Sequence, residues 1–192
     1  MRCATLDTAP SGQISPVAAL GLGVVTDWTA LIRDVPDYPK PGILFKDITP
    51  LLADHAAFTQ VVGELGDGLA FDKVVGIEAR GFILAAPVAY RSGAGFVPVR
   101  KKGKLPADTY EASYDLEYGS ATIEVHADAF DPGDRVLIVD DVLATGGTAR
   151  AAVELVRRTG AEVVAVSFLM ELSFLSGRDR LPGLDVRTLL TV

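Results

Sequence analysis

Short apolar runs alternate along the chain with longer segments in which apolar side chains recur every three or four positions. The short runs are rich in valine and isoleucine, which is typical of strands buried on both faces. The longer segments have the spacing of amphipathic helices. Alternation of the two predicts an α/β fold, a parallel sheet flanked by helices. The predicted strands are 73–77, 96–101, 120–126, 135–141 and 162–170, and the predicted helices are 56–70, 82–93 and 148–160.

Other segments do not follow this rhythm. Residues 1–23 are rich in Ala, Gly, Ser and Pro without a sustained period, and they predict a flexible extension. The segment 28–39 predicts a short helix that two prolines end, and an extended Ile-Leu-Phe run follows at 43–45. Residues 103–119 combine Gly, Pro, Asp, Ser and Tyr. They predict a long loop, a kind of segment that is usually functional or disordered.

Composition limits the classes of protein that fit. The 192 residues are 49% hydrophobic, which suffices for one domain with a real core. The formal net charge of −7 argues against a broad surface for nucleic acid, so any anion site must be local. Cys3 is the only cysteine, which excludes a disulfide within the chain and a cysteine-based metal site. With no run of ~18 apolar residues and no signal-peptide pattern, we expect a cytoplasmic protein without a membrane partner.

The most informative stretch is RVLIVDDVLATGGTAR, residues 135–150. A buried strand runs into two carboxylates, Asp140 and Asp141, and a loop with two glycines then leads into a helix. The unpaired N–H groups and the dipole of a helix start attract an anion, and glycine lets a phosphate approach the backbone closely. The predicted phosphate-binding residues are Ala144, Thr145, Gly146, Gly147 and Thr148.

Two carboxylates beside a phosphate site need a ligand that also offers hydroxyl donors or carries magnesium. A sugar phosphate with a free cis-diol meets the first condition, and a pyrophosphate with bound Mg²⁺ meets the second. 5-Phosphoribosyl-1-pyrophosphate (PRPP) has all these parts, with its ribose hydroxyls placed to donate to Asp140 and Asp141. The alternative is an ordinary strand–helix turn with a helix cap. The loop has neither a Walker A pattern nor a Rossmann fingerprint.

The run VLIVDDVLATGGTA resembles the PRPP-binding motif of the type I phosphoribosyltransferases. Three further stretches, in matching order, resemble parts of the adenine phosphoribosyltransferases of that family. They are the hood segment at 37–52, the pyrophosphate loop at 76–82 and the mobile catalytic loop at 100–126. The resemblance extends from about residue 31 to about residue 172.

This resemblance implies a fold and a domain organisation. The family has a parallel sheet flanked by helices, a small N-terminal hood that recognises the base, and a mobile catalytic loop. The loop would close over PRPP and exclude water from the oxocarbenium-like ribose centre. We expect a single domain at 24–192, with the hood at about 31–52 and the core at about 53–192, and we expect a homodimer. Residues 1–23 lie outside the resemblance.

Pyrophosphate contacts follow from the resemblance. It implies that Arg80, Arg100 and Lys104 bind the pyrophosphate of PRPP, and leaves open which of the last two reaches across a dimer interface. It also implies a cis peptide bond between Glu78 and Ala79. From the residues alone, Arg80 could instead pair with Glu78 at the surface. The basic cluster at 100–104 could likewise be an ordinary solvated face.

Base recognition and catalysis are implied in two other places. Phe45 is implied to stack on the base, while Leu44 and Lys46 read its edge through their main chain. Lys46 replaces the arginine that is commoner in the family, a change that a main-chain contact survives. Glu117, in the mobile loop, is implied as the catalytic residue that accepts a proton from the base. The alternatives are that residues 43–45 are core and that Glu117 is a solvated acid.

The expected reaction is adenine + PRPP → AMP + pyrophosphate, a step of purine salvage. No residue is expected to bind a metal directly, because Mg²⁺ is held mainly through PRPP; His55 and His126 are expected to be surface or packing residues. Two alternatives stay open: an enzyme of the same family for another base, and a PRPP-sensing regulator without catalysis. The hood segment argues against the first. The short, non-basic segment 1–30 argues against the DNA-binding domain that the second requires.

Overall fold

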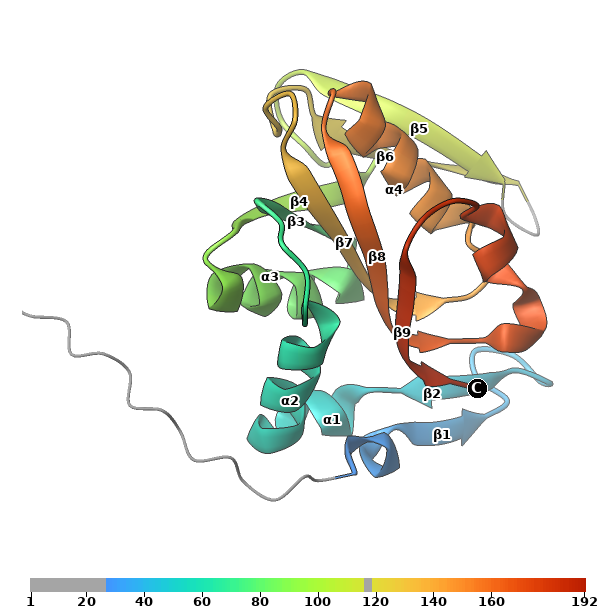
Figure 1. Cartoon of the computed structure of the whole chain (residues 1–192). Coiled ribbons are helices and arrows are strands. Elements are labelled where there is room, and N and C mark those ends of the chain that lie inside the picture. The colour runs from blue at the N-terminus through green and yellow to red at the C-terminus, as the bar shows by residue number, and fades with distance from the viewer. Residues whose placement is uncertain (1–26, 116–118) are drawn as a thin grey trace, which may run out of the picture.

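The computed structural model describes residues 27–115 and 119–192. Within them, a seven-stranded sheet forms the centre of the molecule, in the order β5-β6-β4-β3-β7-β8-β9 (Figure 1). The strands from β4 to β9 in that order pair in parallel, whereas β6 and β5 add an antiparallel hairpin beside β4. The strands are β3 Lys73–Ile77, β4 Gly95–Lys101, β5 Thr109–Asp115, β6 Ser120–His126, β7 Arg135–Leu143, β8 Glu162–Glu171 and β9 Val186–Thr191.

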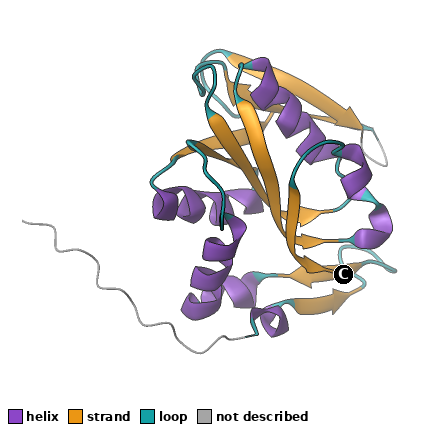
Figure 2. Ribbon diagram, in the orientation of Figure 1, coloured by secondary structure: helices purple, strands orange, loops and turns teal. Residues whose placement is uncertain are grey.

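Helices cover both faces of this sheet (Figure 2). Helix α4, Gly147–Arg158, packs with the β5–β6 hairpin on one face, and α2, His55–Leu65, and α3, Arg80–Ser92, pack on the other. Successive strand residues point to opposite faces. The core between the sheet and α4 is here called the α4 core, and the core between the sheet and helices α2 and α3 is called the α2–α3 core. In β7, for example, Ile138 belongs to the α4 core and Leu137 to the α2–α3 core, and both are fully buried. The predicted parallel sheet flanked by helices is therefore confirmed.

A smaller sheet lies below the main sheet in the view of Figure 1. Strand β1, Arg33–Pro36, pairs antiparallel with β2, Leu44–Asp47. The remaining elements are short: η1 Trp28–Leu31, α1 Thr49–Ala53, η2 Ser173–Leu175 and η3 Gly177–Arg180. The helix predicted over 28–39 is thus wrong beyond its first turn. The pairing of β1 with β2 decides the conformation there, because a tertiary ladder outweighs the weak helical preference of a short segment.

The long loop predicted at 103–119 is also wrong over much of its length, because Thr109–Asp115 forms strand β5. Tyr110, Ala112 and Tyr114 alternate with polar residues and pack against the α4 core. This period of two is the signal for a half-buried strand. Strand β9 was not predicted at all, although its segment 186–191 is mostly apolar or β-branched.

Two predicted features lie outside the described residues: the extension 1–23 and Glu117. Both histidines lie as expected. His55 is exposed at the start of α2, and Nε2 of His126 lies 2.7 Å from the carbonyl oxygen of Pro106. In the described part of the chain, no helix has the length and apolar character needed to cross a membrane.

Candidate active site

The phosphate loop, which we define as residues 144–148, joins β7 to α4. β7 runs to Leu143, two residues further than predicted, and α4 begins at Gly147. The residue before the helix, Gly146, has a φ of 77°, a left-handed conformation that glycine adopts at little cost. No side chain among the described residues caps this helix start. Its N–H groups therefore stay available to an anion, unlike those of the ordinary capped turn considered above.

Two glycines hold this loop against a segment near the C-terminus. A Cβ atom on Gly146 would lie 2.3 Å from the carbonyl oxygen of Gly177, and a Cβ atom on Gly177 would lie 2.1 Å from that of Ala144. Neither position therefore has room for a side chain, and backbone rests directly on backbone. Sequence analysis missed Gly177, for which the only signal was a glycine in a polar segment without a predicted element.

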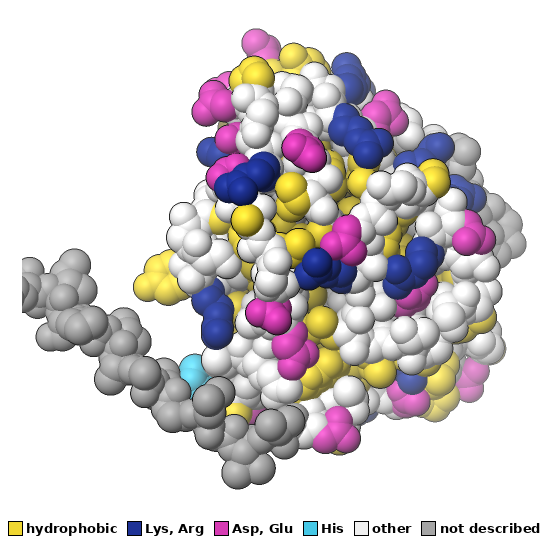
Figure 3. Space-filling model, viewed as in Figure 1, with side chains coloured by type: hydrophobic (Ala, Val, Ile, Leu, Met, Phe, Trp, Pro, Cys, Tyr) yellow, Lys and Arg dark blue, Asp and Glu magenta, His cyan; other side chains and the backbone are white. Residues whose placement is uncertain are grey.

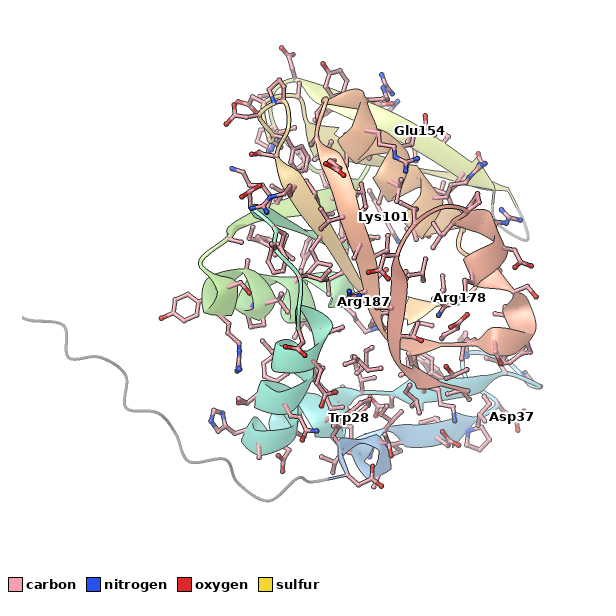
Figure 4. The ribbon with its side chains drawn as sticks, viewed as in Figure 1. Trp28, Asp37, Lys101, Glu154, Arg178 and Arg187 are labelled. Carbon is pink, nitrogen blue, oxygen red and sulfur yellow. The ribbon has the colours of Figure 1, made fainter. Side chains whose placement is uncertain are left out.

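An ion pair fixes the segment that carries Gly177. Arg178 donates to Glu171 at the end of β8, with Nη2 2.6 Å from Oε2, and to the carbonyl oxygen of Val186 at 2.6 Å. Figure 4 shows Arg178 between β9 and the short C-terminal helices. The hydrogen bonds from Arg178 lower the pKa of the buried Glu171, which stays ionised and keeps the clamp charged. The ion pair of Arg178 with Glu171 thus fixes the segment that contacts the phosphate loop through Gly177.

A small hollow of about 70 Å³ lies at the phosphate loop, lined by Asp140, residues 142–149 and Phe168. Asp140 is half-buried, and its Oδ1 accepts a hydrogen bond from the amide of Asp141 at 2.9 Å. Burial, and then the charge of Asp141, raise the pKa of Asp140 well above its usual value. A group that retains its proton more readily can donate to a ligand oxygen as well as accept from a hydroxyl.

Arg80 connects Asp141, near the end of β7, to the small sheet. Its Nε donates to the carboxylate of the buried Asp141, and its guanidinium lies 5.4 Å from the ring centroid of Phe45 in β2. The alternative in which Arg80 pairs with Glu78 is therefore wrong. A Cβ atom on Gly81 would lie 2.8 Å from Oδ1 of Asp140, so the start of α3 lies close against β7. Three stretches that are distant in the sequence meet here.

Glu78 gathers the basic residues of the site. It accepts hydrogen bonds from Nζ of Lys104, from Nε of Arg100 at 3.3 Å and from the amide of Lys101 at 3.0 Å. Burial alone would raise its pKa, but these donors prevail and lower the pKa of Glu78 to about 2. The peptide bond between Glu78 and Ala79 is cis, as the resemblance implied.

Not every lysine of the basic stretch joins this group. Lys102 forms an exposed pair with Glu111 at 2.7 Å, as expected of a solvated face. Arg100 and Lys104 instead converge on Glu78. The turn that carries Lys104 is fixed by the buried Glu124, whose Oε1 accepts the amides of Lys104 and Leu105 at 2.8 Å each. We refer to Glu78, Arg100 and Lys104 as the Glu78 cluster.

The segment predicted to bind the base is exposed rather than core. Ile43 is 37% exposed and Leu44 52% exposed, so the alternative core assignment is wrong for both. Phe45 is half-buried, and its ring makes an edge contact with Tyr38 at 5.1 Å between centroids. The Nζ of Lys46 binds Asp34 at 2.6 Å, so this side chain is held along the small sheet.

Comparison with known proteins defines the class. Residues 50–179 match the family described as the phosphoribosyl transferase domain. This match spans most of the chain, and the paired carboxylates and phosphate loop lie within it. The chain therefore belongs to the phosphoribosyltransferase family, whose members are pentosyltransferases.

The similar proteins narrow the class further. The chain is 68% identical over 166 residues to the adenine phosphoribosyltransferase of Acidothermus cellulolyticus, covering 85% of this chain and 94% of that one. It is 64% identical over 170 residues to the same enzyme of a Nocardioides species, covering 85% and 92%. Within its family, the chain belongs to the adenine phosphoribosyltransferases.

Solved structures agree with this assignment. The adenine phosphoribosyltransferase of Thermoanaerobacter pseudethanolicus has a TM-score of 0.83 at 50% identity, covering 86% of this chain and 98% of that one. The enzyme of Saccharomyces cerevisiae, solved with adenine and an imino-altritol bisphosphate, has a TM-score of 0.78 at 39% identity, covering 83% and 94%. The predicted fold class and family are confirmed.

Proposed function

We propose that this protein transfers the 5-phosphoribosyl group of PRPP to adenine, giving AMP and pyrophosphate for purine salvage. The observation that carries this proposal is the position of Arg80, which contacts the carboxylate of Asp141 and the ring of Phe45. One side chain thus joins the proposed PRPP motif to the proposed base segment. Two substrates bound at these places would meet beside Arg80.

PRPP would bind along the carboxyl end of the main sheet. Its 5-phosphate would accept from the N–H groups of the phosphate loop and from the hydroxyls of Thr145 and Thr148. The ribose hydroxyls would donate to Asp140 and Asp141. The pyrophosphate would bind Arg80, Arg100 and Lys104, whose charges would stabilise the negative charge that develops as it leaves. Since Glu78 and Asp141 hold these cations, pyrophosphate must compete with two carboxylates for them.

Adenine would stack on Phe45 and contact the main chain of Leu44 and Lys46. In this proposal the β1–β2 sheet is the core of the hood, at about 31–52, and the whole domain is 24–192. Glu117 would accept the proton that N9 loses, directly or through N7. General base catalysis of this kind contributes roughly 10²–10⁴ in rate.

Mg²⁺ would enter the site as part of the substrate, bound to the pyrophosphate of PRPP, and would add positive charge where the leaving group departs. No group of three or more His, Cys, Asp or Glu side chains in the described residues has the arrangement of a metal site. We propose no direct protein ligand for the ion, which would be held mainly through PRPP.

We also propose that the enzyme is a cytoplasmic homodimer. Support for a dimer comes from large apolar side chains on the surface of α3 and β4. Ile83 is 45%, Tyr90 89% and Phe96 38% exposed. Burial of these side chains against a second copy of the chain would remove their apolar surface from water. Sedimentation of the purified protein would test the dimer directly.

The decisive test is incubation of the protein with PRPP, Mg²⁺ and labelled adenine. We expect AMP and pyrophosphate in equal amounts, and little product with hypoxanthine, xanthine or orotate. Preference for one of those bases would establish the first alternative. PRPP binding without consumption of any base would establish the regulator. Glu117→Gln should lower kcat strongly and leave PRPP binding unchanged, and a kcat within a few-fold of the parent would remove Glu117 from the mechanism.

A further inference from the structure

A second, larger cavity lies between α4 and the segment 179–184, with a volume of about 430 Å³. Pockets that bind small molecules usually have volumes of ~300–1,000 Å³. The cavity shares no lining residue with the hollow at the phosphate loop. The two sites nevertheless adjoin, since a Cβ atom on Gly146 would lie 3.3 Å from the Cβ of Arg180. We call this space the arginine cavity.

Three arginines surround this cavity, although the chain as a whole has a net charge of −7. Arg150 and Arg157 lie seven positions apart in α4, two turns along one side of the helix. Arg180 lines the cavity from the end of η3. On the face shown in Figure 3, Lys and Arg side chains gather over α4 and the C-terminal segment, with hydrophobic side chains between them.

These three guanidinium groups have no ionic partner among the described residues. Most other arginines of that part of the chain do pair with a carboxylate. Asp179 is the one carboxylate that lines the cavity, and Glu154 of α4 makes no ion pair with the three arginines. Three like charges around one hollow repel each other, so an anion placed there would lower the energy of all three.

The floor of the arginine cavity is apolar. Val153 and Leu181 lie buried beneath it, while the half-buried Leu184 and the exposed Pro182 present apolar surface to the cavity. A simple anion would use the cationic rim and leave this floor uncovered. A ligand with phosphates at one end and a flat, weakly polar body at the other would use both. Arginine suits the phosphate end, because its planar fork can donate two parallel hydrogen bonds to one phosphate.

We propose that the arginine cavity binds an organic polyphosphate of the nucleoside triphosphate class. Its phosphates lie among Arg150, Arg157 and Arg180, and its nucleoside covers Pro182 and Leu184. This site is separate from the PRPP site, and the proposal does not depend on the reaction proposed above.

The test is calorimetric titration of the full chain with cytidine triphosphate, whose pyrimidine does not suit the proposed adenine segment. Arg150→Gln and Arg157→Gln keep part of the side-chain length, and each should weaken binding at least fivefold. The matched control is Arg91→Gln, which removes the same charge from an exposed site on α3 and should change the affinity less than twofold. Melting temperatures close to the parent value would establish that all variants are folded.

Two further measurements locate the ligand. Lys104→Gln, in the proposed pyrophosphate site, should leave cytidine triphosphate binding unchanged, whereas a loss there with intact binding in the α4 variants would overturn the proposal. Inorganic tripolyphosphate should bind at least fivefold more weakly than cytidine triphosphate, because it cannot cover the apolar floor. Equal affinities would refute the nucleoside contact, and the absence of binding at millimolar cytidine triphosphate would refute the site.

Discussion

The phosphate loop and the Glu78 cluster lie in one site but are held in different ways. The phosphate loop is fixed by backbone in contact with backbone at Gly146 and Gly177, where a single added methyl group has no room. The Glu78 cluster is fixed by side-chain charges, with Arg100 and Lys104 converging on one carboxylate. The phosphate loop therefore has no room for larger side chains, and the Glu78 cluster depends on the charges of its side chains.

This difference matches what each region is proposed to do. A 5-phosphate that stays in place throughout the reaction needs a rigid cradle of N–H groups. A pyrophosphate that arrives with PRPP and leaves as product needs cations that can change partners. The Arg and Lys side chains of the Glu78 cluster are long and partly exposed. Both now pair with the carboxylate of Glu78, which the pyrophosphate would replace as their partner. The comparison therefore predicts opposite sensitivities, to size at the loop and to charge at the cluster.

The largest effect is expected from Gly146→Ala. The new methyl group would meet the carbonyl oxygen of Gly177 at 2.3 Å, and the residue would also have to keep a φ of 77°. Because neither backbone can yield without moving the loop, the KM for PRPP should rise at least about 100-fold, a loss of ~3 kcal/mol in binding. Steady-state kinetics at saturating adenine would measure this.

Gly133→Ala is the matched control for that change. Gly133 also has a positive φ, 88°, but a Cβ atom there meets nothing within 4 Å. It should lower stability slightly and leave the KM for PRPP within twofold. Similar KM values for Gly146→Ala and the parent would show that the loop is not the phosphate site or is not rigid.

Sequence alone predicted the features that depend on local pattern. The strands 73–77 and 120–126 were predicted with the bounds that the structure has, and helix α4 within two residues at each end. The phosphate loop and its carboxylates were readable because strand, acid pair and glycines follow each other directly in the chain. Strand β5 was missed because Gly103 and Pro106, just before its start, outweighed the alternation of Tyr110, Ala112 and Tyr114.

Contacts between distant segments could not be predicted in this way. Nothing near Gly177 in the sequence indicates that it rests on Ala144 and Gly146, which precede it by about thirty residues. Arg80 was assigned to pyrophosphate by resemblance, but its contact with Asp141 and Phe45 depends on how α3 lies against β7 and β2. Such pairings are set by the three-dimensional packing, and a single sequence carries no direct record of them.

A second, smaller effect is expected from Arg80→Lys, which keeps the positive charge beside Asp141 and Phe45. Lysine has one ammonium group, so it cannot both donate to Asp141 and cover the ring of Phe45. The KM values for PRPP and adenine should each rise about tenfold, ~1.4 kcal/mol per substrate. Arg135→Lys is the control, since Arg135 pairs with Asp72 at the opposite end of β7. A rise in the KM for PRPP without a rise in the KM for adenine would show that Arg80 does not join the two substrates.

Glu78→Gln tests the charge sensitivity of the Glu78 cluster through stability. The folded-state pKa of Glu78 is about 2 and its usual value is 4.5. Between these values the unfolded chain binds the proton more readily, so the contribution of Glu78 is complete above about pH 4.5 and is lost as the pH falls towards 2. At pH 7 the variant should lose roughly 1–3 kcal/mol in free energy of unfolding.

The measurement is urea denaturation of parent and Glu78→Gln at several pH values. The difference in free energy of unfolding should shrink steadily below pH 4.5. Glu111→Gln is the control, because Glu111 holds the exposed Lys102 and should cost ~0–1 kcal/mol at most. A difference that does not change with pH would mean that Glu78 acts through packing rather than through its charge.

The smallest effect is expected beside the phosphate loop, in Asp140→Asn. Burial and the neighbouring Asp141 raise the pKa of Asp140, so its ionised form costs folding energy. The folded chain then keeps the proton where the unfolded chain has lost it, and stability falls as the pH rises from 3.8 towards the folded-state pKa.

Asparagine removes this cost and keeps the size of the side chain. Asp140→Asn should therefore raise the melting temperature by a few degrees, where ~1 kcal/mol corresponds to about 2–4 °C in a chain of this length. The gain should be largest above the folded-state pKa and should vanish below pH 3.8. The same variant should bind PRPP more weakly, because an amide accepts from ribose hydroxyls less strongly than a carboxylate. A variant less stable than the parent at pH 7 would show that Asp140 is ionised and stabilising in the fold, and would place it with the charge-dependent Glu78 cluster rather than with the phosphate loop.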